Sequence, residues 1–353
     1  MIRLPIAFPR FVLHDLRLST RALASMFGSL SLRQLAALIA LLFVALQIAA
    51  YPVAGWLIAI EDGPDGVMRI TAILASGMAL IIPWIVAQSI ADFTRTLFGR
   101  SDLELILASP VDALALLAAR ALSISVGAVA SVGLLLGPLA DVAALRGHPH
   151  WLALYPALIA AGLAGTGFAI ILSVGLFLAT GPRRARLFGQ IAATAIGASA
   201  VLGAQVVAML PEAMRTTILA TFAPHTNADG ELQGLLWAPV RAAAGDPQAM
   251  LVWTAIGAVV FALACVLFGE RFARAAIATA GAPAYAGAAA RRTSRFGANA
   301  SMALRIKERR VVWRDPWLMS QLLLQAAYTT LFRSKAMLAF APKRDLPLAA
   351  APT

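Results

Sequence analysis

The chain has 353 residues, of which 60% are hydrophobic and only 13% are charged, and its mean hydropathy is +0.81. This composition is typical of an integral membrane protein and excludes a soluble one, because no polar stretch is long enough to fold as a separate domain. The net charge of +12 is spread over short loops beside apolar runs. Membrane topology and anionic lipid headgroups explain such a distribution, and we expect no nucleic-acid partner.

The first 34 residues form a basic segment that we expect to be cytoplasmic and amphipathic. It includes Asp15, Arg17 and Arg21 in a pattern typical of a helix in the lipid headgroup layer. The first long apolar run begins only near residue 35. That position is too late, and the run too long, for a cleaved signal peptide.

Six long apolar runs follow, and each reaches the ~20 residues that a helix needs to cross a ~30 Å hydrocarbon core. They cover residues 35–60, 68–91, 113–139, 151–180, 187–210 and 250–269. We therefore predict an all-α, polytopic membrane protein with a six-helix transmembrane domain over residues 35–269.

The cationic residues are distributed unequally between the two sets of loops. The N-terminal segment, the loop after the second run with Arg120 just inside the third, the loop after the fourth run and residues 270–315 together hold 21 Lys and Arg residues. The remaining loops hold only Arg69, Arg146, Arg215 and Arg241. Because cytoplasmic loops retain Lys and Arg, both ends of the six-helix unit are predicted to face the cytoplasm.

The centres of the runs contain no Asp, Glu, Lys, Arg or His, whereas gradient-driven transporters usually keep ionisable groups within the membrane. The polar side chains there are amides, for which we expect interhelical hydrogen bonds, with substrate contact as the alternative. These are Gln47, Gln88 and Gln205.

Three glycines are expected to allow close helix approach, and two prolines are expected to kink their helices. These are Gly162, Gly165, Gly167, Pro52 and Pro83.

No catalytic or metal-binding constellation is evident along the chain. His148 and His150 flank a proline on the predicted outer side, but no Cys or carboxylate lies nearby in the sequence, so we expect no metal site. His225 has no evident nucleophile partner, and the lone Cys265 lies inside the sixth run. We therefore expect neither an enzyme nor an intrachain disulfide.

The loop between the second and third runs carries the most specific local signal. Ser101 can cap a short helix with Glu104 at the capping-box position, and Pro110 sets the turn into the third run. These residues predict a short acidic helix with an apolar face, which lies across the cytoplasmic ends of the spans. We interpret it as a docking surface, and an ordinary interfacial helix is the alternative.

Residues 99–111 resemble the first cytoplasmic loop of type-two ABC export permeases, which typically show a glycine, a Leu-Glu pair and a Ser/Thr-Pro in this order. The resemblance implies a coupling helix that fits a cleft in a separate ATP-binding subunit. The implied contact residues are Asp102, Leu103, Glu104, Leu105 and Pro110. One departure is that residues 93–98 carry no acid, whereas an acid-rich stretch usually precedes the glycine.

Residues 270–315 are predicted to be a cytoplasmic basic linker that ends in a helix. Residues 302–317 resemble the connecting helix that opens a half of two-half bacterial permeases. Its characteristic residues are Arg305, Lys307, Glu308, Arg310 and Arg314. The acid and two arginines in residues 15–21 recur in residues 308–314, offset by 293 residues. Two unrelated basic segments would produce the same pattern, but a repeat predicts a second six-helix half beginning near Pro316.

The sequence after Pro316 does not continue as such a half. Residues 316–327 start a seventh span that is too short to cross, and residues 328–334 match the in-frame translation of a common sequencing-adapter end. We therefore expect residues 328–353 to be artefactual and the natural protein to be longer. A genuine polar C-terminus is the alternative.

The sequence thus predicts a permease subunit of an ABC exporter in a bacterial inner membrane. It has no glycine-rich loop ending in Lys-Ser/Thr, so we expect no cofactor in this chain and ATP bound by the partner subunit. The other expected partners are membrane lipids and a second permease half or a second copy. An ion-gradient-driven secondary transporter or channel is the principal alternative, and a membrane-embedded enzyme is the third. The transported substrate is not indicated.

Overall fold

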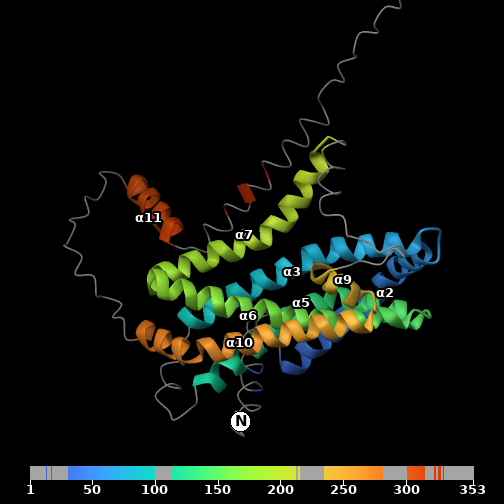
Figure 1. Cartoon of the computed structure of the whole chain (residues 1–353). Helices are drawn as coiled ribbons and strands as arrows, with labels where there is room; N and C mark the ends of the chain where they lie inside the picture. The colour runs from blue at the N-terminus through green and yellow to red at the C-terminus, as the bar shows by residue number, and fades with distance from the viewer. Residues whose placement is uncertain are drawn as a thin grey trace, which may run out of the picture.

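A computed structural model describes residues 31–99, 113–211, 234–280 and 300–314, together with isolated positions outside these ranges. All regular structure among these residues is helical. The helices in chain order are α2 (Leu32–Glu61), α3 (Gly66–Gly99), α5 (Ala113–Leu145), η1 (Pro149–Ala153), α6 (Leu154–Thr180), α7 (Pro182–Met209), η2 (Leu235–Trp237), α9 (Ala238–Ala243), α10 (Pro247–Ala280) and α11 (Ala300–Arg314). The all-α prediction is confirmed for this part of the chain (Figure 1).

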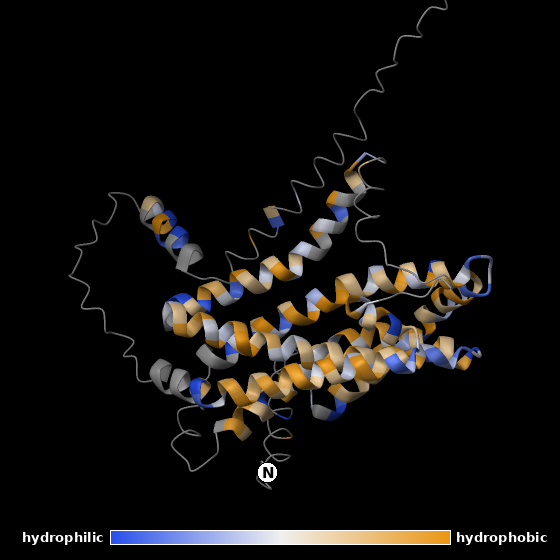
Figure 2. Cartoon of the chain, viewed as in Figure 1, coloured by the Kyte–Doolittle hydropathy of each residue, from blue (hydrophilic) through white to orange (hydrophobic). Residues whose placement is uncertain are grey.

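Five of these helices are long and apolar enough to cross a membrane. The candidate spans are Arg33–Glu61, Gly66–Arg95, Leu114–Leu145, Pro149–Thr180 and Pro247–Phe272. Their outer surfaces carry exposed large apolar side chains such as Leu41, Ile48 and Leu251. So many exposed apolar side chains are unfavourable in water but favourable in lipid. Figure 2 shows this apolar character along the long helices. The chain is a multi-pass membrane protein.

Helix α7 corresponds to the fifth predicted run but is not among these five candidate spans. It has 28 residues, and Arg184 and Arg186 lie in its first two turns. Figure 1 shows α7 packed beside α3 at its start and diverging from the bundle toward its end. It is also paler than its neighbours in Figure 2, because Gln, Ser, Thr and Gly interrupt its apolar residues.

Helix α6 is the centre of the bundle and packs against α10, α3, α5 and α7. Two-thirds (67%) of its apolar window is buried within the protein, whereas none of the corresponding window of α2 is. Glycines make this position possible. A Cβ at Gly162 would lie 2.3 Å from Val129 on α5, and one at Gly167 would lie 2.9 Å from Val260 on α10. Gly165 faces Ile85 on α3 in the same way, so the predicted close approach at all three glycines is confirmed.

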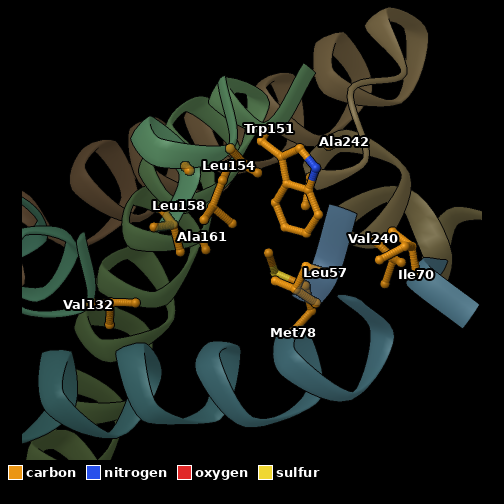
Figure 3. Close-up of a cluster of buried hydrophobic side chains, with 14 of the residues drawn as sticks. Leu57, Ile70, Met78, Val132, Trp151, Leu154, Leu158, Ala161, Val240 and Ala242 are labelled. Atoms are coloured by element: carbon orange, nitrogen blue, oxygen red, sulfur yellow. The ribbon is translucent and has the colours of Figure 1, made fainter. Parts of the chain in front are cut away.

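Two buried apolar clusters divide the bundle along its length. One includes Leu57, Ile70, Val142, Leu154 and Ala249 from five different helices. Figure 3 shows part of it, with the indole of Trp151 lying over Leu57 and Met78. The other cluster is built from Phe93, Leu116, Val174, Ala193 and Phe272, and α7 contributes to it in place of α2. Four helices contribute to both clusters: α3, α6 and α10 run from the first to the second, and α5 runs in the opposite direction.

Helix boundaries follow recognisable local signals. Ser31 caps α2, since its hydroxyl accepts a hydrogen bond from the Gln34 backbone while the Gln34 side chain accepts one from the Ser31 N–H. Gly181, with φ of 75°, ends α6 before Pro182 opens α7. Pro52 and Pro83 both lie within continuous helices. Several helices exceed their predicted runs: α3 and α10 do so at both ends, and α5 continues past Leu139 to Leu145 and therefore includes Asp141.

Candidate functional site

The residues predicted to contact an ATPase are only partly described by the structure. Asp102, Leu103, Glu104, Leu105 and Pro110 lie outside the described residues. The predicted connecting segment is helical as α11, on which Arg305, Lys307 and Glu308 are exposed, and Arg310 and Arg314 belong to the same helix. The N-terminal segment before Ser31, most of residues 316–327 and the tail from Tyr328 are likewise outside the described part, apart from isolated positions.

One end of the bundle, which we call the arginine end, brings together the end of α3, the start of α5, the start of α7 and the end of α10. Phe93 on α3 and Phe272 on α10 pack with ring centroids 5.9 Å apart. A Cβ at Gly269 would lie 3.3 Å from the Leu114 backbone, and one at Gly189 would lie 2.7 Å from Thr94. Among the described residues, exposed cations at this end include Arg33, Arg95, Arg184, Arg186 and Arg271. Residues 100–112, which carry the predicted coupling residues, join α3 to α5 here.

The opposite end, which we call the histidine end, gathers three potential metal ligands. His150 Nε2 lies 2.8 Å from Glu61 Oε1, and His148 Nδ1 lies 3.6 Å from Glu61 Oε2. One donor atom from each of the three side chains lies within 4.8 Å of the other two. Glu61 ends α2, whereas the histidines belong to the connection between α5 and α6. Two histidines and a carboxylate match the donor set of several catalytic zinc sites.

Local backbone geometry positions the two histidines. Gly147, with φ of 101°, follows the last residues of α5, and the His148 N–H then donates to the Ala143 carbonyl at 3.1 Å. Pro149 opens the short η1 helix with its preset φ, so His150 follows within the first turn. The two imidazole rings meet edge to face, with centroids 5.8 Å apart.

Trp151 fixes the carboxylate to this connection. Its indole is buried at 4% exposure, and its Nε1–H donates to Glu61 Oε2 at 3.1 Å. A buried indole N–H needs such a partner, because leaving it unpaired costs about 1–3 kcal/mol. The Trp151 ring therefore holds Glu61 beside the histidines while its carbon atoms pack in the core (Figure 3).

The expectation of no metal site depended on the absence of a carboxylate near the two histidines in the sequence, whereas the structure brings Glu61 beside them in space. Glu61 precedes His148 by 87 residues and reaches it only because α2 packs against α5. The sequence does contain a signal for this proximity, because the acidic turn at residues 61–65 follows the first apolar run directly. Antiparallel neighbours would place that turn at the same end of the bundle as residues 146–150.

A second polar group lies deeper in the bundle, around Asp141 on α5. Gln47 on α2 donates to Asp141 Oδ2 at 2.9 Å, and the Tyr155 hydroxyl on α6 donates to Oδ1 at 2.8 Å. Three helices are thus joined through one carboxylate. Asp141 follows the third predicted run, residues 113–139, but the candidate span Leu114–Leu145 includes it. One ionisable group therefore lies toward the histidine end of a span.

Interhelical hydrogen bonds account for two of the three glutamines as predicted. Gln47 bonds to Asp141, and Gln88 Oε1 on α3 accepts from the Ser131 hydroxyl on α5 at 2.9 Å. Ser89 and Thr166 add a buried contact between α3 and α6, with their hydroxyls 3.3 Å apart. Such bonds satisfy polar groups that lipid could not.

Comparisons with known proteins found no counterpart for this chain. No protein-family model, no curated protein and no solved structure matches it.

Proposed function

We propose that this chain is the transmembrane permease subunit of an ABC exporter in a bacterial inner membrane. The observation that carries the proposal is that α3 ends and α5 begins at the arginine end, so residues 100–112 connect two helices there. If that end faces the cytoplasm, as its cations favour, the acidic sequence of this connection would be within reach of a soluble ATPase. ATP hydrolysis in that partner would move the loop and, through α3 and α5, switch the spans between inward- and outward-facing states.

The path of the chain supports a sixth span formed by α7. Helix α6 ends at Gly181, at the arginine end, whereas α10 starts at the histidine end, where Gly245 lies beside His150. The chain must return across the bundle between these points. Helix α7 has 28 residues, or about 42 Å at 1.5 Å per residue, which exceeds the ~30 Å hydrocarbon core. Six crossings would bring the start of α2 and the end of α10 to the same side, which the cations assign to the cytoplasm.

Helix α7 also indicates why a second half or a second copy is expected as a partner. Exposed apolar residues lie along it, including Leu187, Phe188, Ile191 and Val206, although it contacts the bundle mainly through α3. Lipid or another permease unit would cover this face. The expected partners remain the ATP-binding subunit, lipids, and a second permease half or a homodimer.

One observation favours the alternative of an ion-gradient-driven transporter or channel. Asp141, with Gln47 and Tyr155 around it, is an ionisable group inside a candidate span, and such groups commonly bind coupling ions. Its position only one turn before the end of α5 favours a structural role near the interface. The ABC interpretation therefore stays preferred.

The proposal is tested by charge inversion at Glu104. We expect the full chain, purified from its native membrane in mild detergent, to retain an ATP-binding subunit. Glu104→Arg should reduce that retention, because losing a well-placed charged interface contact typically costs ~2–5 kcal/mol. Glu231→Arg, the same change on the predicted outer side, is the matched control and should retain the ATPase fully.

Two results would contradict this proposal. Absence of any ATP-binding subunit from the wild-type preparation removes its central partner, and equal retention by the two variants removes residues 100–112 from the interface. If transport instead follows an ion gradient and stops in Asp141→Asn, the secondary-transporter alternative is correct.

A further inference from the structure

We propose that Glu61, His148 and His150 bind a divalent transition-metal ion, of which Zn²⁺ fits best, at the histidine end of the bundle. This binding does not depend on the proposed transport function. Zn²⁺ binds imidazole nitrogen and carboxylate oxygen at about 2.0–2.2 Å, so neighbouring ligand atoms in a tetrahedral site lie roughly 3.4 Å apart. Glu61 Oε1 lies 2.8 Å from His150 Nε2 and Glu61 Oε2 lies 3.6 Å from His148 Nδ1. One donor atom from each of the three side chains lies within 4.8 Å of the other two, so small side-chain movements would bring them to that spacing.

The surrounding residues would support such a site. With His148 binding through Nδ1, its Nε2 lies 4.0 Å from Asp62 Oδ2, so a closure of about 1 Å would give the carboxylate–histidine–metal arrangement common around bound zinc. The Trp151 indole N–H donates to Glu61 Oε2 at 3.1 Å. Glu61 is thus oriented by a neighbour that does not itself bind the ion.

The chemistry of the donors selects the class of ion. Imidazole nitrogens suit Zn²⁺ and other first-row transition ions, whereas Mg²⁺ and Ca²⁺ prefer sites made wholly of oxygen ligands. Three protein ligands leave a fourth position for water, as in open zinc sites. The site is also reachable from solvent, since the side chains of Glu61 and His148 are each 21% exposed and that of His150 is 39% exposed.

The ion would join helix α2 to the α5–α6 connection. Helix α2 is the least embedded span, because none of its apolar window is buried within the protein. Coordination at Glu61 adds a strong attachment at the end of that helix. The structure therefore assigns the metal a stabilising role at the outer surface, and ion binding should raise the unfolding temperature of the chain by binding only the folded state.

The experiment uses the full chain without a polyhistidine tag, purified in non-ionic detergent and freed of metal with a chelator. Isothermal titration calorimetry with Zn²⁺ should give one site per chain and a rise in unfolding temperature with added Zn²⁺. The chain has four histidines, which provides an internal comparison. H148A/H150A should lose the site, and H14A/H225A should bind Zn²⁺ as the wild type does.

A milder pair of variants keeps the test decisive if H148A/H150A fails to fold. Asp62→Asn removes the carboxylate near His148 and should weaken Zn²⁺ binding about 10- to 100-fold, as loss of outer-shell partners typically does. Asp65→Asn makes the same charge change on an exposed residue three positions away and should leave the affinity unchanged. Equal affinities in these two variants, or wild-type binding by a folded H148A/H150A protein, would overturn the proposal.

Discussion

Asp246 directly precedes α10, outside the candidate spans, and both of its carboxylate oxygens accept hydrogen bonds. Its Oδ1 accepts from the backbone N–H groups of Gln248 and Ala249, and its Oδ2 accepts from Arg241 Nε at 2.8 Å. Burial raises the pKa of this carboxyl, but the Ala249 hydrogen bond, the Arg241 and Gln248 hydrogen bonds and the Arg241 charge together hold it below its ordinary value of 3.8.

The lowered pKa of Asp246 predicts how the stability of the protein changes with pH. Because the folded pKa lies below the unfolded one, ionised Asp246 stabilises the fold fully above the unfolded value, and that stability is lost as the pH falls through the folded pKa. The wild type should therefore exceed Asp246→Asn in unfolding temperature at pH 7, and the difference should shrink below about pH 4. Thermal unfolding in detergent measures it. A difference that stays constant down to pH 3 would contradict the assignment, and Arg241→Gln should reduce the pH dependence.

At the scale of elements, the packing of α10 on α6 depends on backbone contact. A Cβ at Gly257 would lie 2.5 Å from the Ala160 carbonyl oxygen and 3.2 Å from the Ala160 Cα. Backbone atoms cannot move aside as a flexible side chain can, so the two helices would have to separate. Separation would also weaken the Trp253 indole hydrogen bond to the Ala157 carbonyl, now 3.1 Å.

We therefore expect Gly257→Ala to destabilise the protein by about 1–3 kcal/mol, the usual cost of overpacking a close interface. Gly175→Ala on α6 is the matched control, because a Cβ there meets nothing within 4 Å and alanine favours a helix more than glycine does. Chemical unfolding in detergent micelles compares them. If Gly257→Ala is as stable as Gly175→Ala, then α6 and α10 do not pack as closely as described.

At the scale of the whole molecule, the two ends of the bundle should face opposite sides of the membrane. The native Cys265 is buried at 4% exposure, so replacing it with alanine gives a simple background for cysteine labelling. In intact cells a membrane-impermeant maleimide should label P64C at the histidine end, and should label R184C at the arginine end only after permeabilisation. Both positions are exposed, so differences in labelling report sidedness.

Reporter fusions provide an independent control for this topology. Fusions after Arg184 and Arg295 should report the cytoplasm, and fusions near Gly63 and Asp229 should report the exterior. Asp229 tests α7 directly, because residues 212–233 follow it toward the outer side in the six-span arrangement. A cytoplasmic signal there would mean that α7 does not cross.

Sequence alone was sufficient to locate the long apolar helices. Bilayer thickness imposes a minimum length on an apolar run that crosses it. Each residue also contributes to hydropathy independently of its neighbours in space. The same reasoning anticipated the amide hydrogen bonds of Gln47 and Gln88 and the close approach at Gly162, since polar groups and small residues in lipid have few alternatives. Helix lengths were less predictable, and α5 includes Asp141 because backbone hydrogen bonding continues where hydropathy falls.

Only the tertiary structure decided which side chains meet. The distance between Glu61 and His150 depends on how α2 packs against α5, and no local pattern encodes the rotation and axial offset of one helix against another. The same holds for the shared carboxylate of Asp141, whose partners come from helices 94 residues before it and 14 residues after it. Hydropathy describes the solvent that a helix prefers, whereas a site depends on the relative placement of several helices, which their packing determines.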